Sequence, residues 1–165
     1  MKVLYGIQGT GNGHISRAMD IIPSLAKKTD LDILVSGCQS DIGLQYPIKY
    51  RKKGLSFIFG KKGGIDLAAT LTKLNPIQFY QDIKDLPVHE YSLVISDFEP
   101  ITAWAGKQQK VATVGIGHQY VFNYAVPQKK PNWISHNVLN KFAPTDRIIP
   151  LHWHHFDAPI LPPIV

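Results

Sequence analysis

The glycine-rich segment Gly9–His14 (GTGNGH) has the residue types and spacing of a ligand-binding turn. It follows an apolar run, Lys2–Gln8, that predicts a strand, and it precedes a helical pattern. Glycines at a strand-to-helix turn let a ligand approach the backbone closely, and the helix N-terminus presents unpaired N–H groups and the positive end of the helix dipole. We therefore expect Gly11, Asn12 and Gly13 to bind a phosphate group or a substrate. The alternative is a tight turn that requires glycine for its geometry alone.

The spacing of these glycines argues against two common nucleotide-binding motifs. In the dinucleotide fingerprint G-x-G-x-x-G, the third glycine would fall at position 14, where this chain has His14. The second predicted strand ends in Val35-Ser36-Gly37 and so lacks the acidic residue that binds a ribose. No G-x-x-x-x-G-K-[ST] pattern occurs in the sequence. We therefore predict no cofactor of the NAD type and no P-loop.

His14 and Asp97 are the strongest candidates for catalytic residues. His14 stands in the first helical turn, where the helix dipole disfavours the cationic imidazole and so favours a neutral general base. Asp97 follows the apolar run Ser92–Ser96, at the carboxyl end of a predicted parallel strand, where open α/β sheets bind their ligands. An Asp there can orient His14 and stabilise its imidazolium. The alternatives are a capping or packing role for His14 and an N-cap role for Asp97, in a helix that begins near Glu99.

Two further residues are candidates for the same site. Glu99 is a second carboxylate close to the strand end, with a role as a first-turn acid of the following helix as the alternative. His118 follows the predicted strand Val111–Ile116, so it can line the same cleft. We include both residues in the expected binding site for a phosphate or a substrate.

The segment His152–Asp157 (HWHHFD) holds the densest group of side chains that can bind a metal. A zinc site needs three or four ligands that converge tetrahedrally. On a strand, His152 and His154 would share a face while His155 points away. We therefore predict no metal site and interpret the segment as a polar loop.

The elements that must position these residues alternate between buried strands and helices. Predicted strands are Lys2–Gln8, Leu31–Ser36, Ser92–Ser96, Val111–Ile116 and the shorter Leu55–Phe59. Predicted helices are Ile15–Ala26 with an internal Pro23, Ile65–Leu74, a helix that begins at Asn75-Pro76, Glu99–Gln108 and Asn132–Phe142. Continuous apolar strands that alternate with helices indicate an α/β protein, a Rossmann-like parallel sheet with helices on both faces.

Length and charge limit the function further. A chain of 165 residues suits one domain, and no stretch approaches the roughly 20 apolar residues of a membrane span. The single cysteine excludes an intramolecular disulfide framework and fits a cytoplasmic location. The net charge of +6 favours anionic partners such as phosphates or a membrane surface. The basic segments Arg51–Lys53 and Lys61–Lys62 are either solvated loops or such a surface, and no recognition motif points to nucleic acid.

With these residues in view, the chain resembles the N-terminal half of GT-B nucleotide-sugar glycosyltransferases, a group that includes UDP-sugar glycosyltransferases and the lipid-linked peptidoglycan N-acetylglucosaminyl transferases. The resemblance rests on the first strand with the turn Gly9–His14, on the helix start Ile15–Ala18, on Ser96–Pro100 (SDFEP) and on Gly115–Gln119 (GIGHQ). It covers the whole chain. It implies an acceptor-side domain over residues 1–158, and residues 159–165, which are rich in proline, as the start of an interdomain linker.

The resemblance also implies a mechanism. The domain would hold a glycosyl acceptor, a lipid-linked one among the options, while a C-terminal domain absent from this chain binds the nucleotide-sugar donor. His14 matches the base that deprotonates the acceptor, and Asp97 roughly matches its carboxylate partner. Transfer would be inverting, independent of metal and without a cofactor, in a cytoplasmic protein with peripheral contact at the inner face of the membrane as an option. The chain alone would be inactive.

Two alternatives remain open at this stage. One is half of a sugar-nucleotide epimerase with the same two-domain architecture. The other is a non-catalytic module that recruits a donor-binding partner to membranes.

Overall fold

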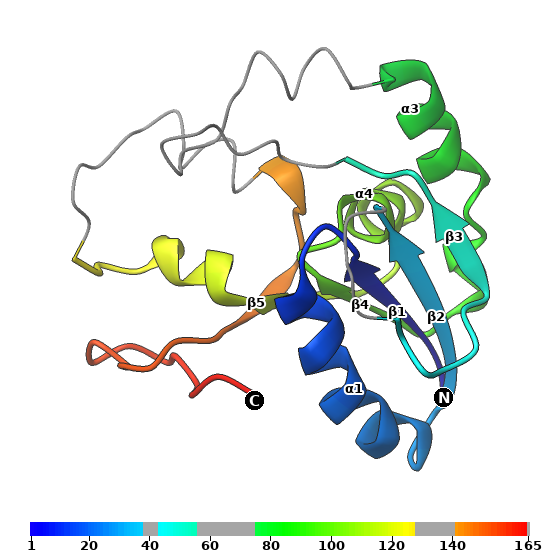
Figure 1. Ribbon diagram of the computed structural model, residues 1–165. Helices are drawn as coiled ribbons and strands as arrows, with labels where there is room; N and C mark the ends of the chain where they lie inside the picture. The colour runs from blue at the N-terminus through cyan, green and yellow to red at the C-terminus, as the bar shows by residue number, and fades with distance from the viewer. Residues whose placement is uncertain (38–42, 56–74, 128–140, 165) are drawn as a thin grey trace.

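The fold is a parallel sheet in which the loops that lead into the helices follow the carboxyl ends of the strands. The computed structural model describes residues 1–37, 43–55, 75–127 and 141–164. Within these ranges, six parallel strands form one sheet in the order β3-β2-β1-β4-β5-β6 (Figure 1). The strands are β1 (Lys2–Gln8), β2 (Asp30–Ser36), β3 (Tyr50–Lys52), β4 (Leu93–Asp97), β5 (Thr113–Gly117) and β6 (Arg147–Pro150). The α/β, Rossmann-like fold predicted from the sequence is confirmed.

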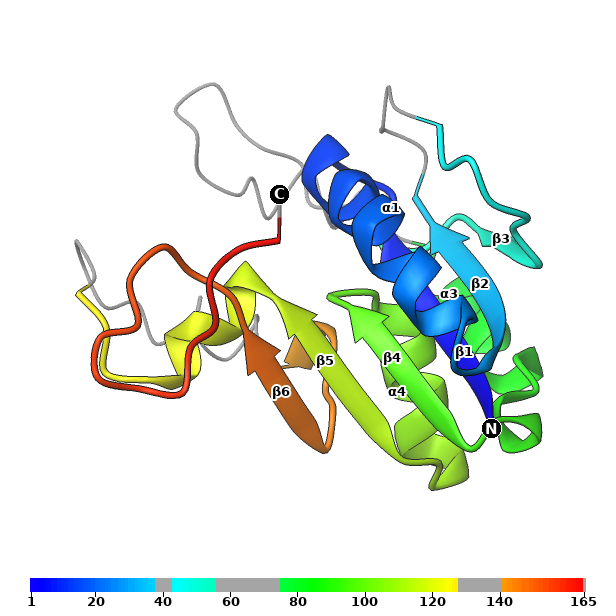
Figure 2. The ribbon, with the colours of Figure 1, turned by 90° about the horizontal axis from the view of Figure 1, so that it is seen from below.

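Helices cover both faces of this sheet. α1 (Asn12–Ala26) packs on one face of β1 and β2, while α4 (Pro100–Gln109) lies on the opposite face, with α3 (Pro76–Asp85) beside it (Figure 2). Two short 3₁₀ helices, η1 (Val88–Glu90) and η2 (His118–Asn123), precede β4 and follow β5. The sheet is therefore a middle layer, as expected when strands carry apolar residues on both faces.

Local sequence sets where the helices begin. Asn75 caps α3, because its side-chain oxygen accepts a hydrogen bond from the Gln78 N–H at 3.1 Å, as predicted. α4 begins with Pro100 in its first turn, after the cap residue Glu99. Pro23 lies inside α1, which nevertheless continues to Ala26. Three predicted elements fall wholly or largely outside the described residues: the strand at 55–59 and the helices at 65–74 and 132–142.

The two faces of the sheet bury different apolar sets, because successive residues of a strand point to opposite sides. On the α4 side, Leu4 packs with Val94, Ile101 and Ala105. On the α1 side, the core consists of Tyr5, Ile7, Ile15, Ala18, Ile22, Ile33, Val35, Ile116 and Leu151. Tyr5 is fully buried on the α1 side, and this placement sends its hydroxyl toward the start of that helix.

The C-terminal segment lies against the edge of the sheet beyond β6. The Leu161 N–H donates to the Pro150 carbonyl at 3.0 Å, and the His152 N–H donates to the Leu161 carbonyl at 2.9 Å. On the α1 side of β4, β5 and β6, a cavity of about 570 Å³ is lined by aliphatic side chains and by this segment. The segment is extended, as its proline content indicates.

The packing of α4 against β1 generates a first prediction. A Cβ atom on Gly6 would overlap the buried side chain of Thr102. Gly6→Ala therefore forces α4 away from the sheet, and we expect a loss of roughly 1–3 kcal/mol in the free energy of unfolding. Urea unfolding followed by circular dichroism measures it. The matched control is Gly43→Ala, where a Cβ meets no described atom within 4 Å. Equal stability of both variants would contradict this packing.

Candidate active site

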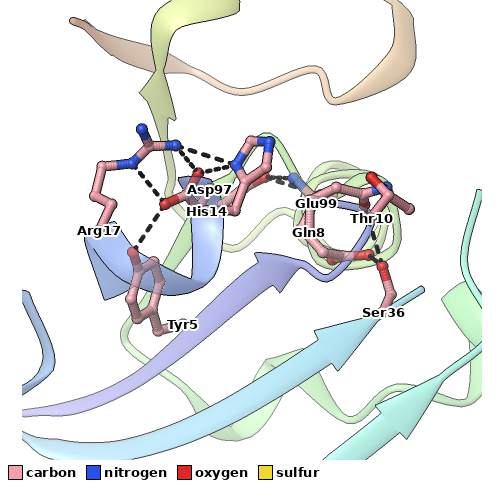
Figure 3. Close-up of polar contacts among 9 residues, drawn as sticks. Tyr5, Gln8, Thr10, His14, Arg17, Ser36, Asp97 and Glu99 are labelled. Carbon is pink, nitrogen blue, oxygen red and sulfur yellow. Dashed lines mark hydrogen bonds and ion pairs between the residues drawn. The ribbon is translucent and has the colours of Figure 1, made fainter. Parts of the chain in front are cut away.

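The carboxyl ends of the central strands bring the predicted catalytic residues together. β1 and β4 pair in a register that sets Ile7 opposite Asp97, so the end of β4 lies beside the turn that follows β1. That turn is held against β2, where the Gly9 N–H donates to the Ser36 carbonyl at 2.6 Å. α1 starts directly after it and presents His14 to Asp97 (Figure 3).

Asp97 is the centre of the site. Its side chain is fully buried and accepts hydrogen bonds on both oxygens. Oδ1 lies 2.6 Å from His14 Nδ1 and also accepts from Arg17 Nη2. Oδ2 accepts from Arg17 Nε at 2.9 Å and from the Tyr5 hydroxyl at 3.1 Å. Burial by itself raises the pKa of the Asp97 carboxyl, but the hydrogen bonds and charges of His14 and Arg17 outweigh burial and hold that pKa below its ordinary value. Asp97 is therefore ionised at neutral pH.

An ionised Asp97 fixes the tautomer of His14. A carboxylate oxygen at 2.6 Å from Nδ1 only accepts, so Nδ1 must carry the proton that it donates. Arg17 Nη2, at 3.1 Å from the same nitrogen, is then a second donor that converges on Oδ1. In the neutral imidazole the lone pair stands on Nε2, which forms no hydrogen bond with a described residue. The His14 side chain is 15% exposed, and Nε2 is the ring nitrogen that Asp97 does not engage.

Arg17 and Tyr5 belong to the site although we did not predict either as a site residue. Arg17 follows His14 by three residues, a spacing that places both side chains on one face of the helix. Burial tends to lower the pKa of Arg17, but the hydrogen bonds and charge of Asp97 raise it. Burial, and then the negative charge of Asp97, raises the pKa of Tyr5 well above its ordinary value. Both residues therefore act as donors to the carboxylate.

Glu99, rather than Asp97, is the N-cap of α4. Its Oε1 accepts from the Ile101 N–H at 2.9 Å, and its Oε2 accepts from the Thr102 N–H at 2.7 Å. Ser36 Oγ also donates to Oε1, at 2.6 Å. Burial raises the pKa of Glu99, and these hydrogen bonds offset only part of that effect. The fully buried carboxylate thus caps α4, from one residue before the first turn in which the alternative role placed Glu99.

A second polar network joins this cap to the glycine turn. Gln8 Nε2 donates to Thr10 Oγ1 at 3.1 Å and to the Leu55 carbonyl at 2.7 Å, and Ser36 lies between Gln8 and Glu99 (Figure 3). These contacts tie the turn to β2 and to the segment after β3. The hydrogen bonds of Gln8 therefore hold the start of the turn in place.

The three glycines of the turn differ in what surrounds them. A Cβ on Gly9 would lie 3.0 Å from the Ser36 carbonyl oxygen, so the close contact with β2 requires glycine. Gly11 has an extended backbone that any residue adopts, and neither Gly11 nor Gly13 has a described atom within 4 Å of its Cβ position. Turn geometry thus accounts for Gly9 but not for the other two. Asn12, between them, is exposed on the first turn of α1.

The end of β5 also borders the site. Gly117 has φ +146°, a left-handed conformation that favours glycine, and its Cβ position lies 3.7 Å from Arg17 Nη2 and 4.0 Å from Asp97 Oδ1. Gln119 approaches the same position at 3.0 Å, and its buried Oε1 has no hydrogen-bond partner among the described residues. His118 lies at the same strand end but is exposed, with Nδ1 3.2 Å from the Leu151 carbonyl. The structure shows no contact between His118 and His14.

The histidines of the segment 152–157 use their ring nitrogens on the backbone of the segment itself. Nδ1 of His152 accepts from the His154 N–H at 3.0 Å, and Nδ1 of His154 accepts from the Phe156 N–H at 2.9 Å. Nδ1 of His155 accepts from the Asp157 N–H at 3.0 Å. Within the described ranges, no three His, Cys, Asp or Glu side chains lie in a group that could hold a metal ion. These contacts fit a turn built by histidine side chains.

The described part of the chain contains no helix that is long and apolar enough to cross a membrane.

The family match and the structural neighbours together identify the fold as a GT-B glycosyltransferase-type domain. The sequence model of Glycosyl transferase family 1 matches residues 1–150, and the chain therefore belongs to that family. No curated protein matches the sequence significantly.

Solved structures support the fold. The crystal structure of Acinetobacter baumannii MurG superposes with a TM-score of 0.50 and 10% sequence identity, over 98% of this chain and 44% of the MurG chain. A UDP-N-acetylglucosamine 2-epimerase superposes with a TM-score of 0.51 and 11% identity, over 91% of this chain and 41% of the epimerase. The chain thus spans less than half the length of either protein. The expected resemblance to one half of a GT-B protein is confirmed at the level of family and fold.

The buried carboxylate generates a second prediction. Asp97→Asn leaves the Arg17 cation without its counter-ion, and we expect a loss of roughly 3 kcal/mol in the free energy of unfolding at pH 7. Because the pKa of folded Asp97 lies below its unfolded value of about 3.9, its stabilising effect is complete above that pH and is lost as the pH falls through the folded value. The difference between wild type and variant should therefore shrink below about pH 4.

Urea unfolding at a series of pH values measures this difference. The matched control is Asp157→Asn, since the Asp157 side chain is 99% exposed, and it should follow the wild type at every pH. A gap between wild type and Asp97→Asn that stays constant down to pH 2 would contradict an ionised, paired Asp97.

Proposed function

We propose that this chain is the acceptor-side domain of an inverting, nucleotide-sugar-dependent glycosyltransferase in which His14 is the general base. The observation that carries the proposal is the contact of His14 Nδ1 with the buried Asp97 carboxylate, which leaves Nε2 as the proton acceptor. The family match and the fold support the reaction class.

The proposed reaction is a single displacement. An acceptor hydroxyl oxygen attacks the anomeric carbon of the sugar, and its proton passes to His14 Nε2. The bond from the anomeric carbon to the diphosphate breaks, and the nucleoside diphosphate leaves with the electron pair. Asp97 keeps Nδ1 protonated and oriented, and stabilises the imidazolium that forms. Inversion follows because the attacking and leaving oxygens lie on opposite faces of the carbon. We propose no metal or cofactor for this step.

The glycine turn is the proposed binding site for a phosphate or for the acceptor. Side chains are absent at Gly11 and Gly13, so a ligand can reach the backbone N–H groups at the start of α1. Asn12 and His118 lie at the same edge of the sheet, and we propose them as further contacts. Glu99 is not carried into this proposal, because its carboxylate is buried and already accepts from the start of α4.

The acceptor-side assignment covers residues 1–158, with residues 159–165 as the start of a linker to a donor-binding domain. A lipid-linked acceptor, at the inner face of the membrane, is one version of this proposal, and the net charge of +6 favours an acceptor that carries phosphate.

A second candidate function is half of a sugar-nucleotide epimerase. The superposition on a UDP-N-acetylglucosamine 2-epimerase favours it. The two functions differ in their need for an acceptor, because an epimerase changes the sugar nucleotide itself and a transferase consumes it.

A transfer assay tests the proposal. The longest product of the gene that encodes this chain is incubated with UDP-sugars and candidate acceptors, and the products are followed by mass spectrometry. We expect His14→Ala to lower the rate of transfer by about 10²–10⁴-fold, the usual contribution of a general base. The fold should be retained, because Tyr5 and Arg17 still donate to Asp97 and the His14 ring is not part of the apolar core.

The control is His89→Ala, in η1, where the ring contacts Gln109 and not Asp97. It should retain the wild-type rate. Equal rates for both variants would refute His14 as the base. Isomerised UDP-sugar without an acceptor would establish the epimerase, and no reaction together with a co-purified donor-binding protein would favour a recruitment module.

A further inference from the structure

Arg17 contacts both the candidate base His14 and its carboxylate partner Asp97. Its Nη2 is 3.1 Å from His14 Nδ1, and the same guanidinium forms a two-pronged ion pair with Asp97 through Nε and Nη2. The Arg17 side chain is only 12% exposed, so solvent screens these interactions weakly. The guanidinium therefore contacts both members of the proposed His14–Asp97 pair.

The contacts of the carboxylate show how Arg17 and His14 share it. Oδ1 accepts from both residues, while Oδ2 accepts from Arg17 and Tyr5. The planar guanidinium fixes the plane of the carboxylate, because two of its N–H groups bind the two different oxygens. With the plane fixed, Oδ1 is held on the line to His14 Nδ1.

The charges lead to the same conclusion. A buried carboxylate with no counter-ion would favour the imidazolium form of His14, which cannot accept a proton. The charges of Arg17 and Asp97 cancel. Among the described residues, Arg17 from α1 and Asp97 from β4 are the charged groups in contact with His14. Tyr5 of β1 reaches the same carboxylate as a neutral donor. The neutral amide of Gln119, from η2, approaches the Cβ position of Gly117 that Arg17 and Asp97 also border.

We propose that Arg17 is a positioning residue that shares Asp97 with His14, fixing the plane of the carboxylate and balancing its charge so that His14 remains a neutral Nδ1–H imidazole. The inference rests on the proposed function of His14 as a base. It assigns to Arg17 a task other than stability: keeping Nε2 unprotonated before the acceptor binds.

Nitrogen-15 NMR of the histidine side chains tests this on the chain itself, because it distinguishes imidazolium from each neutral tautomer. Spectra are recorded at pH about 6.5, where an ordinary histidine is half protonated. In Arg17→Gln the carboxylate is uncompensated, and we expect the ratio of imidazolium to neutral His14 to rise about ten-fold or more. Arg17→Lys keeps the positive charge but not the planar guanidinium, so in this variant His14 should again be mainly neutral, unlike in Arg17→Gln. Arg51→Gln, on the exposed residue of β3, is the control and should match the wild type.

Variants of Asp97 keep the test decisive if Arg17→Gln does not fold. In Asp97→Asn the unpaired Arg17 cation should suppress the imidazolium below the wild-type level, and the double variant Arg17→Gln/Asp97→Asn should return it toward that level. The inference would be overturned if His14 had the same protonation state in Arg17→Gln as in the wild type, and the same state in the double variant as in Asp97→Asn. These spectra report the role of Arg17 directly, whereas the transfer assay reports the role of His14, so failure of one is distinct from failure of the other.

Discussion

The site depends on one buried charge. Asp97 stands at the end of a central strand with no exposure to solvent, and a carboxylate in that position persists only if donors surround it. Tyr5, His14 and Arg17 provide those donors from β1 and α1. The same three contacts that make the ionised form stable also tie the start of α1 to the sheet. The charge of Asp97 and the position of α1 therefore depend on the same three contacts.

Several other features follow from this constraint. The helix must begin close to β4, which requires a short turn after β1 that can pass against β2, and Gly9 makes that approach possible. Gly117 adopts the φ of +146° with which β5 ends beside the ion pair, a conformation that favours glycine. Glu99 holds the start of α4 on the other side of the strand end, so the backbone around Asp97 is fixed from both faces of the sheet. His14 presents to a ligand the ring nitrogen Nε2, which lies on the side of the ring away from the Asp97 contact.

Much of the arrangement could be predicted from the sequence because it depends on periodicity and on strand ends. The apolar runs of β1, β2, β4 and β5 indicated a parallel sheet, and the rule that ligands bind at carboxyl ends selected Asp97. The strands that the sequence did not indicate are short and lie at the two sides of the sheet. β3 has three residues and one exposed arginine, and β6 ends in a proline at the side of the sheet, so neither shows a continuous apolar run.

The donors to Asp97 were harder to find, for physical reasons. Tyr5 sits inside an apolar strand, where its ring accounts for its presence and its hydroxyl gives no separate signal. Arg17 is one cation in a helix with a polar face, and only the three-residue spacing from His14 hints at a shared task. Asp97 was a possible cap of α4 and Glu99 a possible acid of its first turn, but Glu99 takes the cap position. The choice between them depends on the backbone direction after β4, which local sequence does not determine.

The claim at the centre of this account is that Asp97 is ionised while fully buried. A carbon-13 NMR titration of the Asp97 side-chain carboxyl, in the protein labelled at aspartate, measures this directly. The account predicts a carboxylate signal throughout the neutral and mildly acidic range, with a pKa below the ordinary aspartate value of about 3.9. A pKa at or above that value would show that burial outweighs the donors, and the proposed pairing with His14 and Arg17 would then be wrong.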